Sequence, residues 1–199
     1  DVRVKAPAKV NIGLRVLPSR EDGYHNIESI FQCVPFYDIL HIKQTDSAGC
    51  NCIVNCDDMV LPHENTLTLA YKAFCDITGV SASVSVCLEK HIPDGAGLGG
   101  GSSDAAALVN ALECMYNVQL SMENRWKIAS KVGSDVFFFL SPEVVDSKCA
   151  LVSGRGEIVK AFPSRQDLFF VLICPEVHSS TKDAYRLVDN RYAPDWLWS

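Results

Sequence analysis

Residues 93–104 decide the fold, and they read PDGAGLGGGSSD. The segment follows an alternating stretch, residues 81–88, which predicts a β-strand, and it runs into a helix with Leu108 and Leu112 on its apolar face. Glycine gives the backbone access to positive φ, and a loop that opens a helix leaves unpaired N–H groups at the positive end of the helix dipole. The segment therefore predicts a phosphate-binding loop, with a flexible linker or tight turn as the structural alternative.

Two common phosphate-binding motifs do not fit this loop. The dinucleotide fingerprint needs an acidic residue at a strand end about twenty positions further on. Glu113 and Glu123 lie near that distance, but both fall in predicted helices. A Walker loop needs a lysine after its glycines, whereas Gly101 is followed by two serines. The loop therefore belongs to another class.

Length and composition exclude several kinds of protein. The chain has 199 residues, of which 48% are hydrophobic and 21% charged, with a formal net charge of −6. These values indicate a globular protein of one large or two small domains. The acidic balance argues against a nucleic-acid partner. The longest apolar run, residues 168–174, is too short to span a membrane, so we expect no membrane partner. Nine scattered cysteines predict reduced thiols in a cytosol.

Periodicity predicts the remaining elements. Residues 9–16 alternate, with Val10, Ile12, Leu14 and Val16 on one face and Lys9, Asn11 and Arg15 on the other. Further strands are expected at residues 26–35, 38–44, 50–56, 148–152, 157–162 and 168–174. Helices are expected from the cap Asn65 to Gly79, over 103–117, from Ser121 to Gly133, and over 180–189. A composition shift near Pro142 is the candidate domain boundary.

The glycine-rich loop resembles the ATP loop of the GHMP kinases, the galactokinase–homoserine kinase–mevalonate kinase superfamily. Three more segments resemble the 4-diphosphocytidyl-2-C-methyl-D-erythritol kinase family within it, namely PAKVN at 7–11, REDGYH at 20–25 and GSDVFF at 133–138. The resemblance implies an α+β fold of two subdomains with a left-handed β-α-β crossover. It assigns residues 1–147 to the N-terminal ATP-binding domain and 148–199 to the beginning of the C-terminal substrate-binding domain.

The resemblance also implies a reaction and its cofactors. The activity would be ATP-dependent phosphorylation of the methylerythritol 2-hydroxyl of CDP-methylerythritol, in the non-mevalonate pathway to isoprenoid precursors. ATP and Mg²⁺ would be the cofactors, and a bacterial cytoplasm or a plastid stroma the location. Two alternatives stay open: another small-molecule GHMP kinase of the homoserine or mevalonate type, and a non-catalytic module that binds a nucleotide or sugar phosphate.

The resemblance also implies a role for each residue that matches a functional position of the family. Asp135 would be the base, Lys9 would hold it and the reacting hydroxyl, and Asn11 would contact substrate; the alternatives are a helix-capping Asp and a solvated strand face. Tyr24 and Tyr185 would sandwich the cytosine, and His25 would bind its edge. Phe31 would line the methylerythritol end or belong to the core. The nucleotide would contact Asn65, Lys90, Pro93, Asp94, Gly95, Ala96, Gly97, Leu98, Gly99, Gly100, Gly101, Ser102 and Ser103. Asn65 as a helix cap and Lys90 as a surface lysine are the alternatives.

Some features depart from the family's pattern. Asp94 puts a carboxylate beside the loop, and Ser134 and Phe137 replace the usual Ala and Pro around the predicted base. The family's third glycine-rich segment is missing, so we expect a fragment. Cys50, Cys52 and Cys56, with His63 beyond, could suggest zinc. Their even spacing along a strand instead favours buried thiols.

Overall fold

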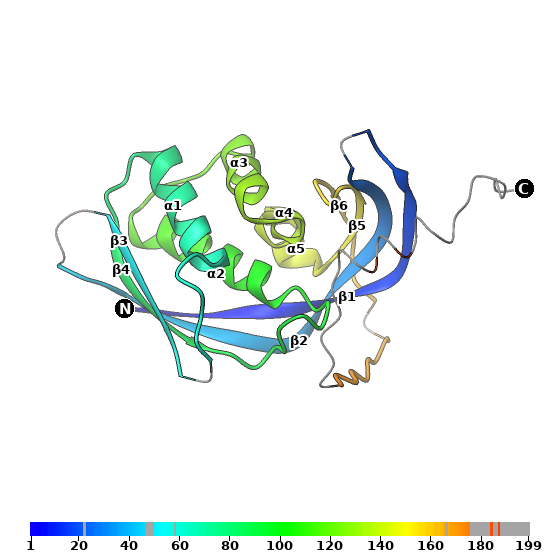
Figure 1. Cartoon of the computed structure of the whole chain (residues 1–199), viewed down its shortest axis with the longest axis horizontal. Helices are drawn as coiled ribbons and strands as arrows, with labels where there is room; N and C mark the ends of the chain where they lie inside the picture. The colour runs from blue at the N-terminus through cyan, green and yellow to red at the C-terminus, as the bar shows by residue number, and fades with distance from the viewer. Residues whose placement is uncertain are drawn as a thin grey trace, which may run out of the picture.

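The structure, a computed structural model, describes residues 1–21, 23–46, 50–57, 59–165, 167–175, 184 and 187. A mixed sheet carries helices on one side (Figure 1). The elements are β1 (Val2–Ser19), β2 (His25–Gln44), β3 (Asn51–Cys56), α1 (Thr66–Thr78), β4 (Ser83–Glu89), α2 (Gly100–Met115), α3 (Met122–Val132), α4 (Ser134–Leu140), α5 (Pro142–Ser147), β5 (Cys149–Gly154) and β6 (Ile158–Ala161).

The long strand β2 organises the sheet, whose order is β3-β4-β2-β5-β6 with β1 paired to β2. β1 runs antiparallel to β2 from Val2–Ile42 to Ser19–His25. On its other side β2 pairs antiparallel with β4 near one end and with β5 near the other. β3 and β4 are parallel and joined by α1, so β3, α1 and β4 form a β-α-β unit. β5 and β6 follow residue 147 and belong to this same sheet.

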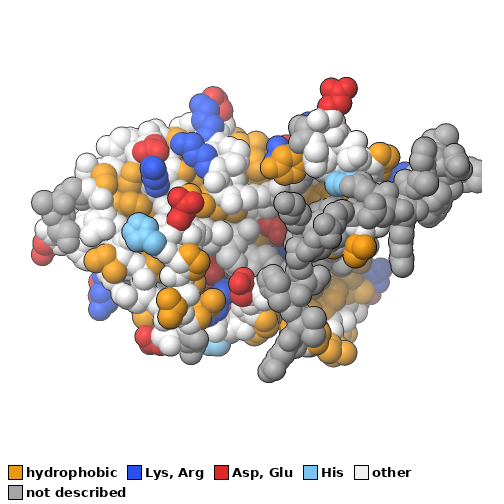
Figure 2. Space-filling model, in the orientation of Figure 1, with side chains coloured by type: hydrophobic (Ala, Val, Ile, Leu, Met, Phe, Trp, Pro, Cys, Tyr) orange, Lys and Arg blue, Asp and Glu red, His pale blue; other side chains and the backbone are white. Residues whose placement is uncertain are grey.

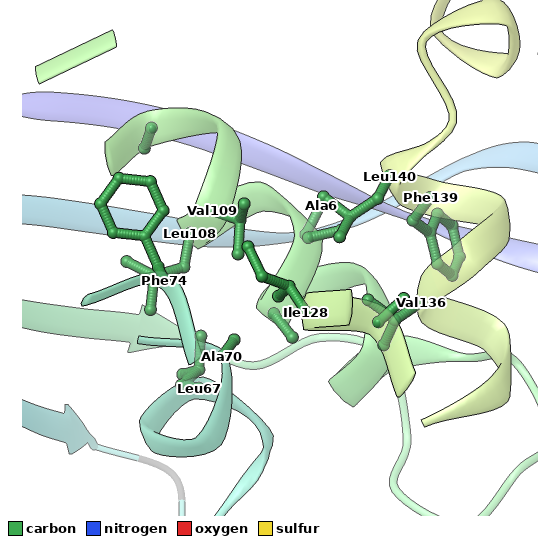
Figure 3. Packing of buried hydrophobic residues seen from close by; sticks show 14 of the residues in the cluster. Ala6, Leu67, Ala70, Phe74, Leu108, Val109, Ile128, Val136, Phe139 and Leu140 are labelled. Carbon is green, nitrogen blue, oxygen red and sulfur yellow. The ribbon is translucent and has the colours of Figure 1, made fainter. Parts of the chain in front are cut away.

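The core lies between the helices and the sheet. Phe74 of α1, Leu108 of α2, Ile128 of α3 and Val136 of α4 are all fully buried there (Figure 3). They pack in one cluster with Leu40 of β2 and other sheet residues. Burial of apolar surface contributes about 25 cal/mol per Å², so this shared core holds the four helices against the sheet.

Several expected elements are confirmed, and their ends show why. Asn65 caps α1, its side chain accepting the N–H groups of Leu67 and Thr68 at 3.0 and 3.1 Å. Gly79 ends α1 with a φ of 73°. The Ser121 side chain accepts from the Asn124 N–H at the start of α3. Residues close in sequence thus satisfy the unpaired backbone groups at the ends of these helices. This explains why the sequence alone was enough to predict where the helices begin and end.

Other expectations are corrected. The two strands predicted at 26–35 and 38–44 are one strand, because the irregularity at Pro35 is absorbed by a register shift against Pro7 and Ala8 of β1. α2 begins at Gly100 rather than residue 103, because the hydrogen bond from the Ser103 N–H to Gly99 O already encloses the glycines in the first turn. Residues 134–140 and 142–147 are helices that periodicity did not reveal.

The strand predicted at 168–174 is wrong. These residues are irregular, and Phe169, Val171 and Ile173 are 86–95% exposed. An apolar run becomes a strand only where another strand offers hydrogen bonds, and no described segment pairs with it. The helix predicted over 180–189 lies almost wholly outside the described residues.

The side chains of β1 alternate between two faces as predicted, but the apolar face is not the more buried one along the whole strand. Ile12 and Leu14 are 36% and 52% exposed, whereas Lys9 is 5% exposed. Beyond Val10 the strand continues to pair with β2, whose other side carries β5, and a shift at Gly13 alters the register. The polar side of the strand therefore faces the helices at Lys9, which makes that lysine part of a site.

Charged side chains of both signs are interspersed over the face seen in Figure 2, and no region of one sign dominates it. This distribution agrees with the modest net charge of −6. Of the helices in the described part of the chain, none has the length and hydrophobicity needed to cross a membrane.

Candidate active site

The glycine-rich loop connects β4 to α2 and lies against Lys9. Gly95, Gly97 and Gly99 have φ values of 69–73°, which side chains disfavour. Gly99 is also sterically closed, since an added Cβ would lie 3.1 Å from Lys9 Cγ and 3.2 Å from Phe139 Cε2. The Lys9 N–H donates to Leu98 O at 2.9 Å. The loop is therefore fixed on β1 by backbone and packing together.

The start of α2 offers unpaired donors. Gly99 precedes the helix without a side-chain cap, and the first intrahelical bond in this turn runs from Ser103 N–H to Gly99 O at 2.9 Å. The N–H groups of Gly100, Gly101 and Ser102 thus have no helical carbonyl to bind. The Ser103 hydroxyl is buried and has no hydrogen-bond partner among the described residues. Such an end attracts an anion.

Lys9 and Asp135 form the ion pair that the resemblance implies. Lys9 Nζ lies 3.3 Å from Asp135 Oδ2, and the two side chains are 7% and 31% exposed. Asp135 lies in the first turn of α4, not near a helix C-terminus, because α3 ends at Val132 and Gly133 separates the two helices. The pair thus combines a nearly buried cation with a carboxylate that solvent and ligands can reach.

The same lysine organises Asn11. Lys9 Nζ donates to Asn11 Oδ1 at 2.7 Å, and Asn11 Nδ2 donates to Ser29 Oγ at 3.0 Å. Ser29 in turn donates to Gly13 O at 2.8 Å. This chain of hydrogen bonds fixes the orientation of the Asn11 amide beside the Lys9–Asp135 pair.

The ring of Phe31 packs against the Lys9 ammonium group. Phe31 is 1% exposed, its ring lies 4.6 Å from Lys9 Nζ, and it meets Phe138 edge-on at 5.3 Å. A ring face attracts a cation, more strongly where water is excluded. Two roles were predicted for Phe31, and its burial agrees with a place in the core rather than with one lining the substrate.

Tyr24 and His25 lie where β1 ends and β2 begins, and Tyr24 contacts the β5–β6 turn. The Arg155 guanidinium stands 3.5 Å from the centre of the Tyr24 ring, and His25 Nδ1 lies 2.8 Å from Leu17 O. In the same turn Gly156 packs on Ser134, so closely that an added Cβ would be 3.0 Å from Ser134 O. Tyr185, the other predicted aromatic, lies outside the described residues.

A cavity of about 180 Å³ lies within the loop, lined by residues 93–102 together with Thr66 and Lys90. Asp94 is among its lining residues. Asn65 is not; it caps α1 and lines a separate cavity between α1 and β3. Thr66, which sequence reasoning missed, contributes instead: a Cβ on Gly101 would lie 3.2 Å from its Oγ1.

A buried charge cluster, Asp38, Lys90 and Asp104, lies beneath the loop. Lys90 Nζ donates to Asp38 Oδ2 and, at 3.2 Å, to Asp104 Oδ2. Asp38 Oδ1 accepts the N–H groups of His91 and Ile92 at 2.6 and 2.8 Å. Lys90 is thus held by two buried carboxylates and is not a free surface lysine. The sequence carried one signal that was missed, a lone carboxylate at position 38 within the apolar stretch of β2.

Burial shifts the pKa values of two groups in the cluster, Asp104 and Lys90. Desolvation, only partly offset by Lys90 and reinforced by Asp38, raises the pKa of Asp104 to about 7. Burial lowers the pKa of Lys90, but Asp104 and Asp38 outweigh that effect, so its pKa lies above the ordinary value. Lys90 therefore stays charged at neutral pH, while Asp104 titrates there.

The cysteines are free thiols. Cys52 and Cys56 are half-buried on the inner side of β3, as expected, and burial raises the pKa of Cys52 to about 12. Cys50 is exposed and precedes the strand, which corrects its predicted burial. Within the described part of the chain, no group of three His, Cys, Asp or Glu side chains could hold a metal ion.

The chain is similar to known kinases in sequence and in fold. Residues 65–142 match the family model of the GHMP kinases N terminal domain. The chain is 42% identical over 186 residues to a 4-diphosphocytidyl-2-C-methyl-D-erythritol kinase of Treponema pallidum (strain Nichols), covering 94% of this chain and 62% of that protein. It is 38% identical over 196 residues to the enzyme of that name in Persephonella marina, covering 98% and 67%. A crystal structure of 4-(cytidine 5'-diphospho)-2C-methyl-D-erythritol kinase superposes with a TM-score of 0.64 at 35% identity, covering 81% and 55%.

Fold and loop together define the class of protein: the chain has the α+β fold of the GHMP kinase superfamily. The match at 38% identity extends over two thirds of the Persephonella marina enzyme. The chain belongs to the 4-diphosphocytidyl-2-C-methyl-D-erythritol kinase family. It spans 62–67% of the length of these two curated relatives.

Proposed function

We propose that this chain provides the ATP site and catalytic pair of a kinase that phosphorylates the methylerythritol 2-hydroxyl of CDP-methylerythritol. The observation that carries the proposal is the position of Lys9, which touches the glycine loop through Gly99 and lies 3.3 Å from Asp135. One side chain thus joins a phosphate-binding element to a candidate base.

The residues present fit the phosphates of ATP. The first turn of α2 supplies N–H groups that have no helical carbonyl to bind, and the loop cavity is lined by residues 93–102 with Lys90; Ser103 lines a separate cavity. The tight contacts at Gly99 and Gly100 leave no space for side chains between the loop and the lysines beneath it. ATP would supply the phosphoryl group, and Mg²⁺ would be carried mainly by its phosphate oxygens.

Asp135 would accept the proton of the substrate hydroxyl. Its partial exposure gives access, and the Lys9 ammonium favours the ionised carboxylate. Lys9 also places positive charge where phosphoryl transfer spreads negative charge. Asn11, held by Lys9 and Ser29, would orient the acceptor.

Tyr24 and His25 would recognise the cytosine. Tyr24 offers an exposed ring, one face of which Arg155 covers, and the His25 ring is anchored at Leu17 O. A site built to hydrogen-bond the cytosine edge leaves groups unpaired against uracil. This base selection distinguishes the proposal from a homoserine or mevalonate kinase.

The test measures phosphoryl transfer from ATP to CDP-methylerythritol, homoserine and mevalonate in parallel, with CDP and UDP as competitors. We expect transfer to CDP-methylerythritol only, and stronger inhibition by CDP than by UDP. His25→Ala should reduce that preference, while His41→Ala, whose ring pairs with Glu89 on the sheet, should keep it. Preferred transfer to homoserine or mevalonate, or equal inhibition by both nucleotides, would contradict the proposal.

A further inference from the structure

The cluster of Asp38, Lys90 and Asp104 has more negative than positive groups. Two carboxyl groups share one ammonium, and their side chains are 0%, 2% and 11% exposed for Asp38, Asp104 and Lys90. With both carboxyls ionised the cluster would carry one net negative charge in a buried site. Such a charge is costly to bury unless it is paired.

The two carboxyl groups are not equivalent. Asp38 uses both oxygens, accepting two backbone N–H groups and Lys90. Asp104 accepts only from Lys90, and its Oδ1 is buried without a hydrogen-bond partner among the described residues. Asp104 is therefore the carboxyl on which a proton is best accommodated, and its pKa of about 7 agrees with that assignment.

The cluster also lies directly against the proposed phosphate site. A Cβ added to Gly100, the first residue of α2, would be 2.7 Å from Lys90 Nζ. Asp104 follows four residues later on that helix. Negative charge arriving at the start of α2 would thus add to the field on Asp104, and a nearby like charge raises the pKa of a carboxyl group further.

No other charged group in the described chain counters this arrangement. Lys90 from the end of β4 and Asp38 from β2 are the charged groups that act on Asp104. β1 and α4 also pack on α2: Lys9 and Asp135 pair with each other, and Lys5 of β1 lines a cavity with Ser103 but is not among the groups that shift the pKa of Asp104. From α1 the residue at this end is the uncharged Thr66.

We propose that Asp104 takes up one proton from solvent when nucleotide phosphates bind at the start of α2. An O–H bond forms on its carboxylate, no other bond changes, and the cluster becomes neutral. Lys90 is then no longer shared by two carboxylates and its charge acts on the bound anion. This inference rests on the proposed function, because it requires a nucleotide in the loop.

The test measures heats of binding of ADP and of a non-hydrolysable ATP analogue by calorimetry. Buffers of different ionisation enthalpy give the protons exchanged, at pH values from 6 to 8.5. The wild type is compared with Asp104→Asn, which matches the protonated carboxyl in shape and charge. Subtraction of the variant removes the protons exchanged by the nucleotide itself. Asp76→Asn is the control, since Asp76 makes an exposed ion pair with Lys131 on the helix surface.

We expect the wild type to take up about 0.3–0.8 proton per nucleotide near pH 7.5, relative to Asp104→Asn, because most of the carboxyl is ionised there before binding. Wild-type affinity should fall as the pH rises above 7, and Asp104→Asn should lose most of that dependence. Asp76→Asn should behave as the wild type. Nucleotide binding with equal proton exchange in wild type and Asp104→Asn would overturn this inference alone. Absence of nucleotide binding by the wild type would overturn the proposed function and this inference together.

A second readout needs no nucleotide. A carboxyl whose pKa is raised on folding contributes stability below its unfolded pKa and loses it as the pH rises through the folded pKa. The stability of the wild type, measured by denaturant unfolding, should therefore fall relative to Asp104→Asn between pH 4 and about pH 7. A constant difference across this range would also overturn the assignment of the proton to Asp104.

Discussion

At the scale of single residues, Lys9 gains its role from neighbours that the sequence separates widely. Its ammonium lies between Asn11 of its own strand, Asp135 of α4 and the ring of Phe31 on β2. Its aliphatic stem packs against Gly99. A solvated lysine would gain little from such an ion pair, whereas exclusion of water strengthens every contact around this one.

We expect Asp135→Asn to lower kcat by about 10²–10⁴-fold with little change in substrate affinity, because the amide keeps the shape but accepts no proton. Lys9→Ala should lower kcat as well. Since the two residues act on one proton transfer, the double variant should be little slower than the slower single variant. Steady-state kinetics of the three variants measures this. Losses that multiply would show that the residues act independently.

At the scale of elements, the glycine loop illustrates how a backbone conformation becomes a binding surface. Three of its glycines have positive φ. The helix that follows begins with two further glycines, Gly100 and Gly101, in ordinary helical conformation. Gly100 itself does not have positive φ; an added Cβ there would lie 2.7 Å from Lys90 Nζ and 3.1 Å from Ile92 Cγ2, so a side chain would have to displace both. The loop thus requires glycine for two different reasons, conformation at Gly95 and Gly97 and contact at Gly100.

Gly99→Ala should weaken nucleotide binding at least tenfold, because the new Cβ meets Lys9 and Phe139 at a φ of 71°. Gly79→Ala is the matched control: its φ is 73°, but an added Cβ there has no neighbour within 4 Å. It should cost about 1 kcal/mol of folding stability and leave nucleotide binding unchanged. Calorimetric titration and thermal unfolding compare the two. Equal binding by both variants would remove Gly99 from the site.

At the scale of the whole molecule, the hydrophobic core and the site share residues. Phe138 belongs to the core and contacts Phe31, whose ring lies beneath Lys9. Phe139, in the same cluster, closes the space at Gly99. Packing of α4 on the sheet therefore sets the position of the Lys9–Asp135 pair, so that the stability of the fold and the geometry of this pair depend on the same side chains.

Phe138→Ala should destabilise the fold by about 3–5 kcal/mol, the usual cost of removing a buried aromatic ring. Leu151→Ala, at a position 42% exposed on β5, should cost no more than about 1 kcal/mol. Denaturant unfolding of both variants measures the difference. A cost below about 1 kcal/mol for Phe138→Ala would mean that α4 is not fixed by this contact.

Much of the fold and of the site followed from local patterns. Asn65 and Gly79 bound α1 because caps satisfy helix ends within a few residues of sequence. The glycine loop was identifiable because its glycines and the helix that follows favour a phosphate-binding loop, whereas Lys9 and Asp135 were assigned through the family resemblance. The prediction at residues 168–174 failed because a strand depends on a partner, which apolar periodicity does not specify.

The sequence by itself determined the caps, the alternation of β1, the glycine-rich loop before α2 and the family to which the chain belongs. Only the tertiary structure decided that the polar side of β1 is buried at Lys9, and that Asp38 and Asp104 meet over one lysine. The physical reason is that caps and glycine conformations are local properties of the chain. Burial and charge pairing instead depend on which distant elements pack together, and β2, α2 and α4 bring these groups within hydrogen-bonding distance only in the folded protein.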